Sequence, residues 1–243
     1  MTFVQSQISR VRHSYKLAKV RQLATRASRV RDYCARHSVV KLNIGCGPAV
    51  KRGWLNIDID PRLEGAIYMD ATQPLGLRDG SVDFAYSEHM IEHVGLDDAI
   101  AMLRELHRVL RPGGMLRIAT PELDKIVQLK NGKLDARQEN YVRLSNMQFG
   151  SAFERSWPQN ACYAINRTFR EWGHKFIYDR STLAWVLSHT GFSDVRFCEI
   201  GQSGIAEFRN LETHGSYSGE EFNQFETMIA EATREARVRH PGL

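Results

Sequence analysis

The stretch LNIGCG occupies residues 42–47 and ends the first buried strand that the sequence predicts, over residues 39–44. Gly45 and Gly47 let the backbone pass close to a bound ligand, since neither carries a side chain. The dinucleotide-binding fingerprint has a third glycine three residues after Gly47, but Val50 stands there. This departure counts against a nicotinamide or flavin cofactor. Taken alone, the motif could also be a plain tight turn without a ligand.

From residue 39 onward, short apolar runs alternate with helical patterns, which is typical of an α/β domain with a mostly parallel sheet. Further strands are predicted over residues 54–58, 66–69, 82–87, 115–119 and 194–200, and helices over residues 96–110 and 181–189. The connection between the first two strands is near the minimum for a crossover. We therefore expect a short helix or a loop there instead of a full helix.

Polar residues follow three of the predicted strands in turn. Asp58 ends the second strand, Asp70 and Ala71 follow the third, and Ser87 ends the fourth. Open α/β sheets bind ligands at the carboxyl ends of their strands, where a carboxylate can accept both hydroxyl hydrogens of a ribose. Each acid alone is more often a surface residue or a helix cap. Their regular placement at successive strand ends predicts a binding site for a nucleoside.

Five segments follow one another in a characteristic order: LNIGCG, NIDID, MDATQPL, SVDFAYSEHMIEHV and LRELHRVLRPGGMLRIATP. In this order the chain resembles the cofactor half of class I S-adenosylmethionine (SAM)-dependent methyltransferases. It is similar in particular to a bacterial group whose first strand reads LNxGCG, followed by GWxNxD, and which is associated with surface-polysaccharide synthesis. The segment GHKFIYDRSTLAWVLSHTGFSDV, residues 173–195, also resembles that group.

The resemblance implies a Rossmann-like methyltransferase sheet of seven strands, mostly parallel, with an antiparallel last pair. This domain would cover residues 39–243, after a basic helical extension over residues 1–38. Residues 225–236 have a helical composition, rich in Ala, Glu and Arg. Residues 228–232, MIAEA, nevertheless resemble the last strand of the family, and we expect a strand there.

Eight residues share an implied contact with SAM. Those at its methionine end are Gly45, Cys46, Gly47, Ser87 and Glu88, while Asp58 binds the ribose and Asp70 and Ala71 bind the adenine. Many methyltransferases have an acidic residue where Asn43 stands. We therefore expect the ammonium group of SAM to be held differently here. A divalent ion is compatible with the family, but no motif indicates one.

His89-Met90-Ile91-Glu92-His93 fits the HxxEH pattern of inverted zinc peptidases. In those enzymes two histidines four residues apart on a helix bind the metal, and the glutamate activates water. Here the pattern follows a predicted strand within a series of methyltransferase motifs, whereas a peptidase needs a long helix and a third ligand far downstream. We interpret Glu92 and His93 as a structural turn and leave His89 as a candidate for the cleft.

Residues 121–178 are expected to form an insertion rich in aromatic side chains. Nine of them fall between residues 141 and 178: Tyr141, Phe149, Phe153, Trp157, Tyr163, Phe169, Trp172, Phe176 and Tyr178. Interleaved with Arg155, Arg167 and Arg170, they suit a sugar ring or an anionic sugar and predict a lid that excludes water. A small satellite core under a long loop is the alternative.

The net charge of +5 is concentrated at the N-terminus, because residues 1–38 hold nine Arg or Lys and a single acid, Asp32. Apolar residues such as Ile8, Val11 and Tyr15 recur there at helical spacing, which predicts one or two amphipathic basic helices. Such a helix could pack on its own domain, on a second subunit in a homodimer, or on a membrane surface or anionic glycan. No nucleic-acid-binding motif accompanies the charge.

The four cysteines are scattered without a CxxC pair, and no stretch approaches 18 apolar residues, so we expect a soluble, cytoplasmic protein. The expected reaction is methylation of an oxygen acceptor, in particular a sugar hydroxyl of a saccharide or glycan. His174 is the candidate general base and His89 the competitor. The alternatives are a methyltransferase for another small metabolite, nitrogen or carboxylate, and a non-catalytic SAM-binding scaffold subunit.

Overall fold

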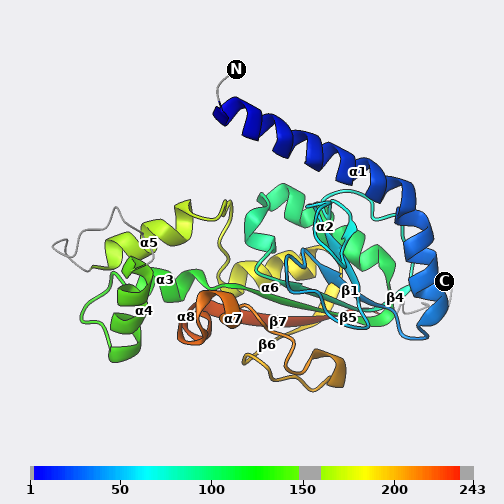
Figure 1. Cartoon of the computed structure of the whole chain (residues 1–243). Coiled ribbons are helices and arrows are strands. Elements are labelled where there is room, and N and C mark those ends of the chain that lie inside the picture. Colours follow the sequence, from blue (N-terminus) through cyan, green and yellow to red (C-terminus); the bar gives the residue numbers. More distant parts are fainter. Residues whose placement is uncertain (1–2, 148–159, 236–243) are drawn as a thin grey trace, which may run out of the picture. The chain divides into compact units, whose positions relative to one another are not determined.

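A computed structural model of the chain describes residues 3–147 and 160–235, without the side chains of residues 3–10 (Figure 1). The chain divides into two compact units. The first unit comprises the chain up to Ser87, residues Ala101–Leu116 and the residues from Arg234 onward. The second comprises Glu88–Ile100 and Arg117–Thr233. The boundary therefore falls inside the motif SVDFAYSEHMIEHV.

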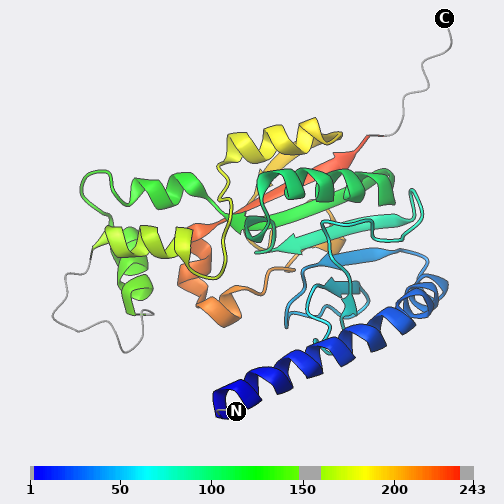
Figure 2. The same ribbon diagram turned by 90° about the horizontal axis from the view of Figure 1, so that it is seen from above.

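Seven strands form one sheet in the order β3-β2-β1-β4-β5-β7-β6 (Figure 2). They are β1 (Lys41–Ile44), β2 (Leu55–Asp58), β3 (Ile67–Tyr68), β4 (Val82–Glu88), β5 (Leu110–Pro121), β6 (Phe192–Cys198) and β7 (Thr227–Arg234). The pairs β1–β2, β1–β4 and β2–β3 are parallel. Ser193 Oγ, near the start of β6, donates to the Thr233 carbonyl, near the end of β7, as an antiparallel pair requires. The predicted seven-stranded sheet with an antiparallel last pair is confirmed.

The connection between β1 and β2 contains no helix, as the short spacing predicts. Buried amide side chains hold it instead. Asn43 Nδ2 donates to Asn56 Oδ1 at 2.8 Å, and the same Oδ1 accepts the Lys51 N–H at 2.8 Å. Asn56 Nδ2 donates to the carbonyls of Lys51 and Trp54. Asn43 and Asn56 therefore supply internal hydrogen bonds that a helix would otherwise make within its own backbone.

Two strands differ from a propensity-based expectation. β5 begins at Leu110, five residues before the predicted start. Gly114 fits in this strand because it has no side chain, since a Cβ there would lie 2.8 Å from the Arg111 carbonyl oxygen. β7 covers the segment with helical composition, so the strand prediction for residues 228–232 is confirmed. Met228, Ile229 and Ala230 are all buried in the sheet. Burial on both faces overrides local helix propensity at this position.

Helices complete each unit. α1 (Phe3–Arg36) belongs to the first unit, and α2 (Leu96–Val109) crosses the boundary between the units. The second unit holds α3 (Leu123–Gln128), α4 (Ala136–Met147), α5 (Ala161–Arg170), α6 (Arg180–His189), α7 (Gly215–Ser218) and α8 (Glu220–Glu226). None of the helices described in residues 3–147 and 160–235 is long and apolar enough to cross a membrane.

The predicted aromatic insertion contributes to a small hydrophobic core of its own. Tyr141 is buried and stacks on Phe222, with ring centroids 4.5 Å apart, and Ala164 and Phe225 belong to the same cluster. Trp172, by contrast, is half exposed. Phe149, Phe153, Arg155 and Trp157 lie outside the described residues. Part of the insertion thus forms a satellite core. That the insertion serves as a substrate lid stays a prediction.

Candidate functional site

The glycine loop follows β1 and is tied to β2. Gly45 and Gly47 have positive φ angles of 61° and 49°, which glycine adopts without strain. The Cys46 N–H donates to the Ile57 carbonyl at 3.1 Å. A Cβ built on Gly47 would have no neighbour within 4 Å, so the loop presents bare backbone to open space. Burial raises the pKa of the Cys46 thiol to about 12, so this thiol stays protonated and is no nucleophile.

Asp58 fixes this loop through its carboxylate. Oδ2 accepts the Gly47 N–H and Oδ1 accepts the Asp60 N–H, both at 2.8 Å. Each carboxylate oxygen keeps lone-pair capacity for one more donor, as the two hydroxyls of a ribose require. The structure therefore brings the glycine loop and Asp58 into direct contact. Sequence reasoning placed both at the same edge but did not foresee the bond between them.

Asp70 and Ser87 end the strands on either side. The Met69 N–H donates to the Asp58 carbonyl at 2.9 Å, which places Asp70 and Ala71 beside the end of β2. Asp70 Oδ1 accepts the Thr72 N–H and hydroxyl in its own turn. Ser87 pairs in register with Ile44, the residue before the glycine loop. Its side chain is fully buried, and within the described chain its hydroxyl has no hydrogen-bond partner.

These features fit the polar groups of SAM. A bare glycine loop, a carboxylate with spare lone pairs and an orphaned buried hydroxyl form one row along the ends of β2, β1 and β4. A buried hydroxyl without a partner costs free energy, which a ligand that hydrogen-bonds to it would recover. The individual contacts of Gly45, Cys46, Gly47, Asp58, Asp70, Ala71 and Ser87 with SAM remain predictions.

Glu88, the first residue of the second unit, has a different set of partners. Its Oε1 accepts the backbone N–H groups of Thr213 and His214 at 2.7 and 2.8 Å, and its Oε2 accepts the Thr213 hydroxyl. These three donors show that Glu88 anchors the segment before α7 in the second unit. Its predicted contact with the methionine end of SAM stays a prediction.

A group of histidines lies in the second unit, beginning with His89 at the end of β4. His89 has a positive φ of 46°, an uncommon conformation for a residue with a side chain. Its Nε2 lies 2.9 Å from Thr227 Oγ1, and Thr227 already donates its hydroxyl hydrogen to Asn223 Oδ1. Nε2 must therefore be the donor. Nδ1 lies 3.1 Å from Glu92 Oε1, so a proton there faces a buried carboxylate.

His89 is accordingly a cation paired with Glu92. Burial opposes the charge of His89, but the contact with the Glu92 carboxylate outweighs it and holds the pKa of His89 above its usual value. Burial likewise opposes the charge on Glu92, and His89 holds its pKa below the usual range. The Thr120 hydroxyl donates to Glu92 Oε2 at 2.9 Å. A protonated His89 has no lone pair, so this arrangement disfavours it as a general base.

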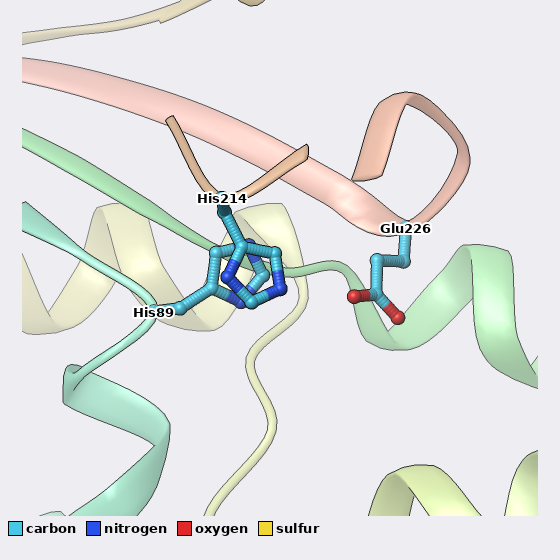
Figure 3. A group of neighbouring side chains, drawn as sticks. All are labelled: His89, His214 and Glu226. Carbon is cyan, nitrogen blue, oxygen red and sulfur yellow. The ribbon is translucent and has the colours of Figure 1, made fainter. Parts of the chain in front are cut away.

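His214 stacks on the His89 ring, with centroids 3.7 Å apart and planes 17° from parallel (Figure 3). Burial and the neighbouring charge of His89 lower the pKa of His214 to about 3, so His214 is neutral. Glu226 lies near the pair in Figure 3 and accepts the Tyr141 hydroxyl at 2.8 Å. Burial raises the pKa of Glu226 to about 7. No local motif marks His214 or Glu226, so sequence reasoning missed both.

His174 is held at one ring nitrogen by a backbone carbonyl. Its Nδ1 lies 2.6 Å from the Thr168 carbonyl oxygen, which can only accept, so Nδ1 carries the proton. Nε2 therefore bears the lone pair in the neutral ring. Burial lowers the pKa of His174, which keeps the ring neutral at neutral pH. The His93 ring packs edge-on against His174, with centroids 4.8 Å apart.

Two groups in the described chain have possible metal-ligand atoms within 4.8 Å of one another: His89, His214 and Glu226, and Glu92, His93 and His174. The stacking disfavours the first group, because a metal lies near the plane of each imidazole that binds it and cannot do so for two parallel rings. The HxxEH pattern is also not presented on one helix. His89 lies in a left-handed turn before a single 3-10 turn, Ile91–His93. This geometry disfavours an inverted zinc peptidase.

Residues 42–118 match a family model described as a methyltransferase domain. This segment is therefore similar to a methyltransferase domain. SAM is the cofactor that this match indicates, in agreement with the row of features along β2, β1 and β4. The matched segment includes every residue predicted to bind SAM, from the glycine loop to Glu88.

Other similarities are more distant. An uncharacterized 37.1 kDa protein in transposon TN4556 of Streptomyces fradiae is 30% identical over 116 residues, which are 38% of this chain and 33% of that protein. The match thus spans about a third of the length of this curated relative. A SAM-dependent methyltransferase from Archaeoglobus fulgidus is 16% identical, with a TM-score of 0.47, over 89% of this chain and 94% of that one. Another, from Mesorhizobium loti, is 20% identical, with a TM-score of 0.48, over 81% and 91%.

Proposed function

We propose that this chain is a SAM-dependent O-methyltransferase that acts on a hydroxyl of a saccharide or glycan, with His174 as general base. The observation that carries the proposal is the hydrogen bond from His174 Nδ1 to the Thr168 carbonyl, which leaves Nε2 as a proton acceptor. A sugar hydroxyl is a poor nucleophile while it keeps its proton, and a neutral imidazole can remove that proton. The resemblance of LNIGCG and GHKFIYD to the polysaccharide-associated group supports the saccharide.

When bound, SAM supplies a methyl group activated by its sulfonium. A bound SAM would supply this methyl group to the acceptor oxygen and leave as S-adenosylhomocysteine, while His174 Nε2 would take the hydroxyl proton. The Thr168 carbonyl holds the ring in the productive tautomer and accepts the other N–H of the imidazolium that forms. The Glu92 charge favours this cation, since it raises the His174 pKa against the effect of burial. Asp58 and the glycine loop hold the cofactor for in-line attack.

A cytoplasmic location belongs to the same proposal. The cysteines at positions 34, 46, 162 and 198 are all free thiols, which is typical of proteins in a reducing compartment. Methylation of a small metabolite other than a sugar is the nearest alternative. A SAM-binding subunit without activity is the alternative outside enzymes.

The experiment that tests the proposal is transfer of a radiolabelled methyl group from SAM to a panel of acceptors. The panel contains free sugars, oligosaccharides, small hydroxylated metabolites, amines and carboxylic acids. We expect label in the saccharides with wild-type protein and with His189→Gln, an exposed histidine stacked on Trp185, but not with His174→Gln. Label in amines alone would contradict an oxygen acceptor. Calorimetry that shows SAM binding without transfer to any acceptor would favour the scaffold subunit.

A further inference from the structure

α1 is a cationic helix attached to the first unit along one side. Residues 3–31 contain eight Arg or Lys and neither Asp nor Glu. On the attached side, Tyr15 donates to the Ile59 carbonyl, Gln22 to the Ala66 carbonyl at 3.2 Å and Tyr33 to the Gly53 carbonyl at 3.0 Å. These hydrogen bonds leave the opposite side of the helix without a role in this attachment.

The outer side of α1 combines apolar and basic residues. At 100° per residue, Leu17, Val20 and Leu23 fall within one arc of about 120°, roughly opposite Tyr15 and Gln22. Their exposed fractions are 58%, 67% and 45%. Ala24 and Ala27 lie in the same arc, and two exposed cations, Lys16 and Arg12, lie within it and at its edge. Large aliphatic side chains so exposed on a helix suggest a surface that is covered in use.

The arc continues into a pocket between the C-terminal half of α1 and residues 69–81. The pocket has a volume of about 720 Å³. Val30, Met69, Leu75 and Leu77 give it apolar walls, and Arg26, Arg31 and Arg78 supply three guanidinium groups. None of the described residues that line it is acidic. Such a lining fits an amphipathic anion.

The outer side of α1 is both cationic and apolar, and this composition distinguishes between three possible partners: a second copy of α1, nucleic acid and an anionic lipid surface. A second copy of α1 would bring two cationic helices together, each with eight Arg or Lys and no acid over residues 3–31, which like-charge repulsion disfavours. Nucleic acid would pair with the arginines but would leave Leu17, Val20 and Leu23 in water. An anionic lipid surface uses both, because phosphates attract the cations and the aliphatic side chains enter the boundary between headgroups and acyl chains.

We propose that the outer face of α1 and the adjoining arginine-lined pocket bind anionic phospholipid at a membrane surface. In this arrangement Leu17, Val20 and Leu23 enter the lipid interface, and Arg26, Arg31 and Arg78 hold a headgroup phosphate. The proposal does not depend on the methyl acceptor. It concerns residues outside the glycine loop and the histidine group, so SAM binding and lipid binding can be measured separately.

The test is co-sedimentation of the full-length protein with vesicles of phosphatidylcholine, alone or with about one-third phosphatidylserine. We expect binding to the mixed vesicles only, and loss of binding as salt rises. Each basic residue near an anionic surface strengthens binding about fivefold, so the triple variant Arg26→Gln, Arg31→Gln and Arg78→Gln should bind roughly 100-fold more weakly. The variant Leu17→Ser, Val20→Ser and Leu23→Ser should lose about tenfold or more.

The matched control is Arg104→Gln, Arg170→Gln and Arg196→Gln, which removes three exposed arginines outside the pocket. It should bind the mixed vesicles within about twofold of wild type. Calorimetry with SAM shows that each variant is folded. Three outcomes would overturn the proposal. They are equal binding to both vesicle types, an equal loss of binding with the control variant, and tighter binding of a single-stranded RNA oligonucleotide than of the mixed vesicles. Retained vesicle binding by the folded pocket variant would overturn the role of the pocket.

Discussion

The His214 imidazole lies flat against the His89 imidazole, with ring centroids 3.7 Å apart. Two cationic rings would repel each other at this separation. We therefore expect only one of the two imidazoles to be protonated. The ion pair with the Glu92 carboxylate places that charge on His89, and His214 stays neutral. Glu88 holds the backbone of His214 in this position.

Replacement of His89 by Asn should destabilise the protein strongly. It removes the cation that faces Glu92, whose side chain is fully buried, and breaking a buried ion pair on one side costs about 3–5 kcal/mol. Urea unfolding followed by circular dichroism measures the loss. His214→Phe is the matched control, since it keeps a flat ring on His89 and leaves the ion pair intact. Equal stability of wild type and His89→Asn would contradict the buried ion pair.

The stability of the wild-type protein should fall as the pH falls below about 6.5, in part because of His214. Its folded pKa of about 3 lies below the usual value, so the unfolded chain binds the proton between these two pH values and the folded chain does not. The free energy of unfolding therefore rises with pH in this window. At pH 5 the effect of one such histidine is about 1–2 kcal/mol.

Urea unfolding of wild type and His214→Phe at pH 7 and pH 5 measures this contribution. The variant should lose less stability between the two pH values than wild type does. The same pH dependence in both proteins would show that His214 is not buried in the neutral form.

Asp58→Asn should weaken SAM binding by about tenfold or more. The carboxylate accepts the Gly47 and Asp60 N–H groups, so an amide NH₂ would face one of these donors and disturb the loop. The charge-assisted hydrogen bonds to the ribose would also be lost, at about 1.5–3 kcal/mol each before compensation by water. Calorimetry with SAM measures the affinity. Asp60→Asn, two residues further along, is the control and should bind SAM as wild type does.

The cofactor half of the site could be predicted because its signals are local. A glycine needed for close approach, such as Gly47, and a carboxylate at a strand end, such as Asp58, stand in short motifs next to recognisable strands. Local propensity alone would have predicted a helix for β7, because its composition is helical. Burial in the sheet decides that this segment is a strand. The Asn43–Asn56 bond was not foreseen, because an amide pair leaves no periodic pattern in the sequence.

The histidine group could be predicted only in part. The sequence drew attention to His89 and Glu92 through the HxxEH pattern of inverted zinc peptidases. In the structure these two residues form a buried ion pair. His214 lies 125 residues after His89 in a segment without a motif, and only the fold brings the two rings together. Tyr141 illustrates the same limit, because an aromatic-rich stretch predicts a lid and a small core equally well.

The pH dependence of methyl transfer should identify His174 as the base. The reaction needs His174 Nε2 without a proton, and burial lowers the pKa of His174 below its usual value of about 6.5. The rate should therefore be constant near neutral pH and fall only in acid, as His174 becomes protonated. His174→Gln should lower kcat by about 100-fold, keep SAM affinity and abolish this acid limb.

The comparison needs kcat and SAM affinity between pH 5 and pH 8 for wild type, His174→Gln and His189→Gln. His189 is exposed on α6, so its variant should keep both the rate and the acid limb. His89 predicts a different profile. Because its folded pKa is raised, a rate limited by a neutral His89 would still be rising with pH above about 6.5, where His174 is already neutral. A rate that climbs through neutral pH, together with near-full activity of His174→Gln, would therefore transfer the role of base to His89.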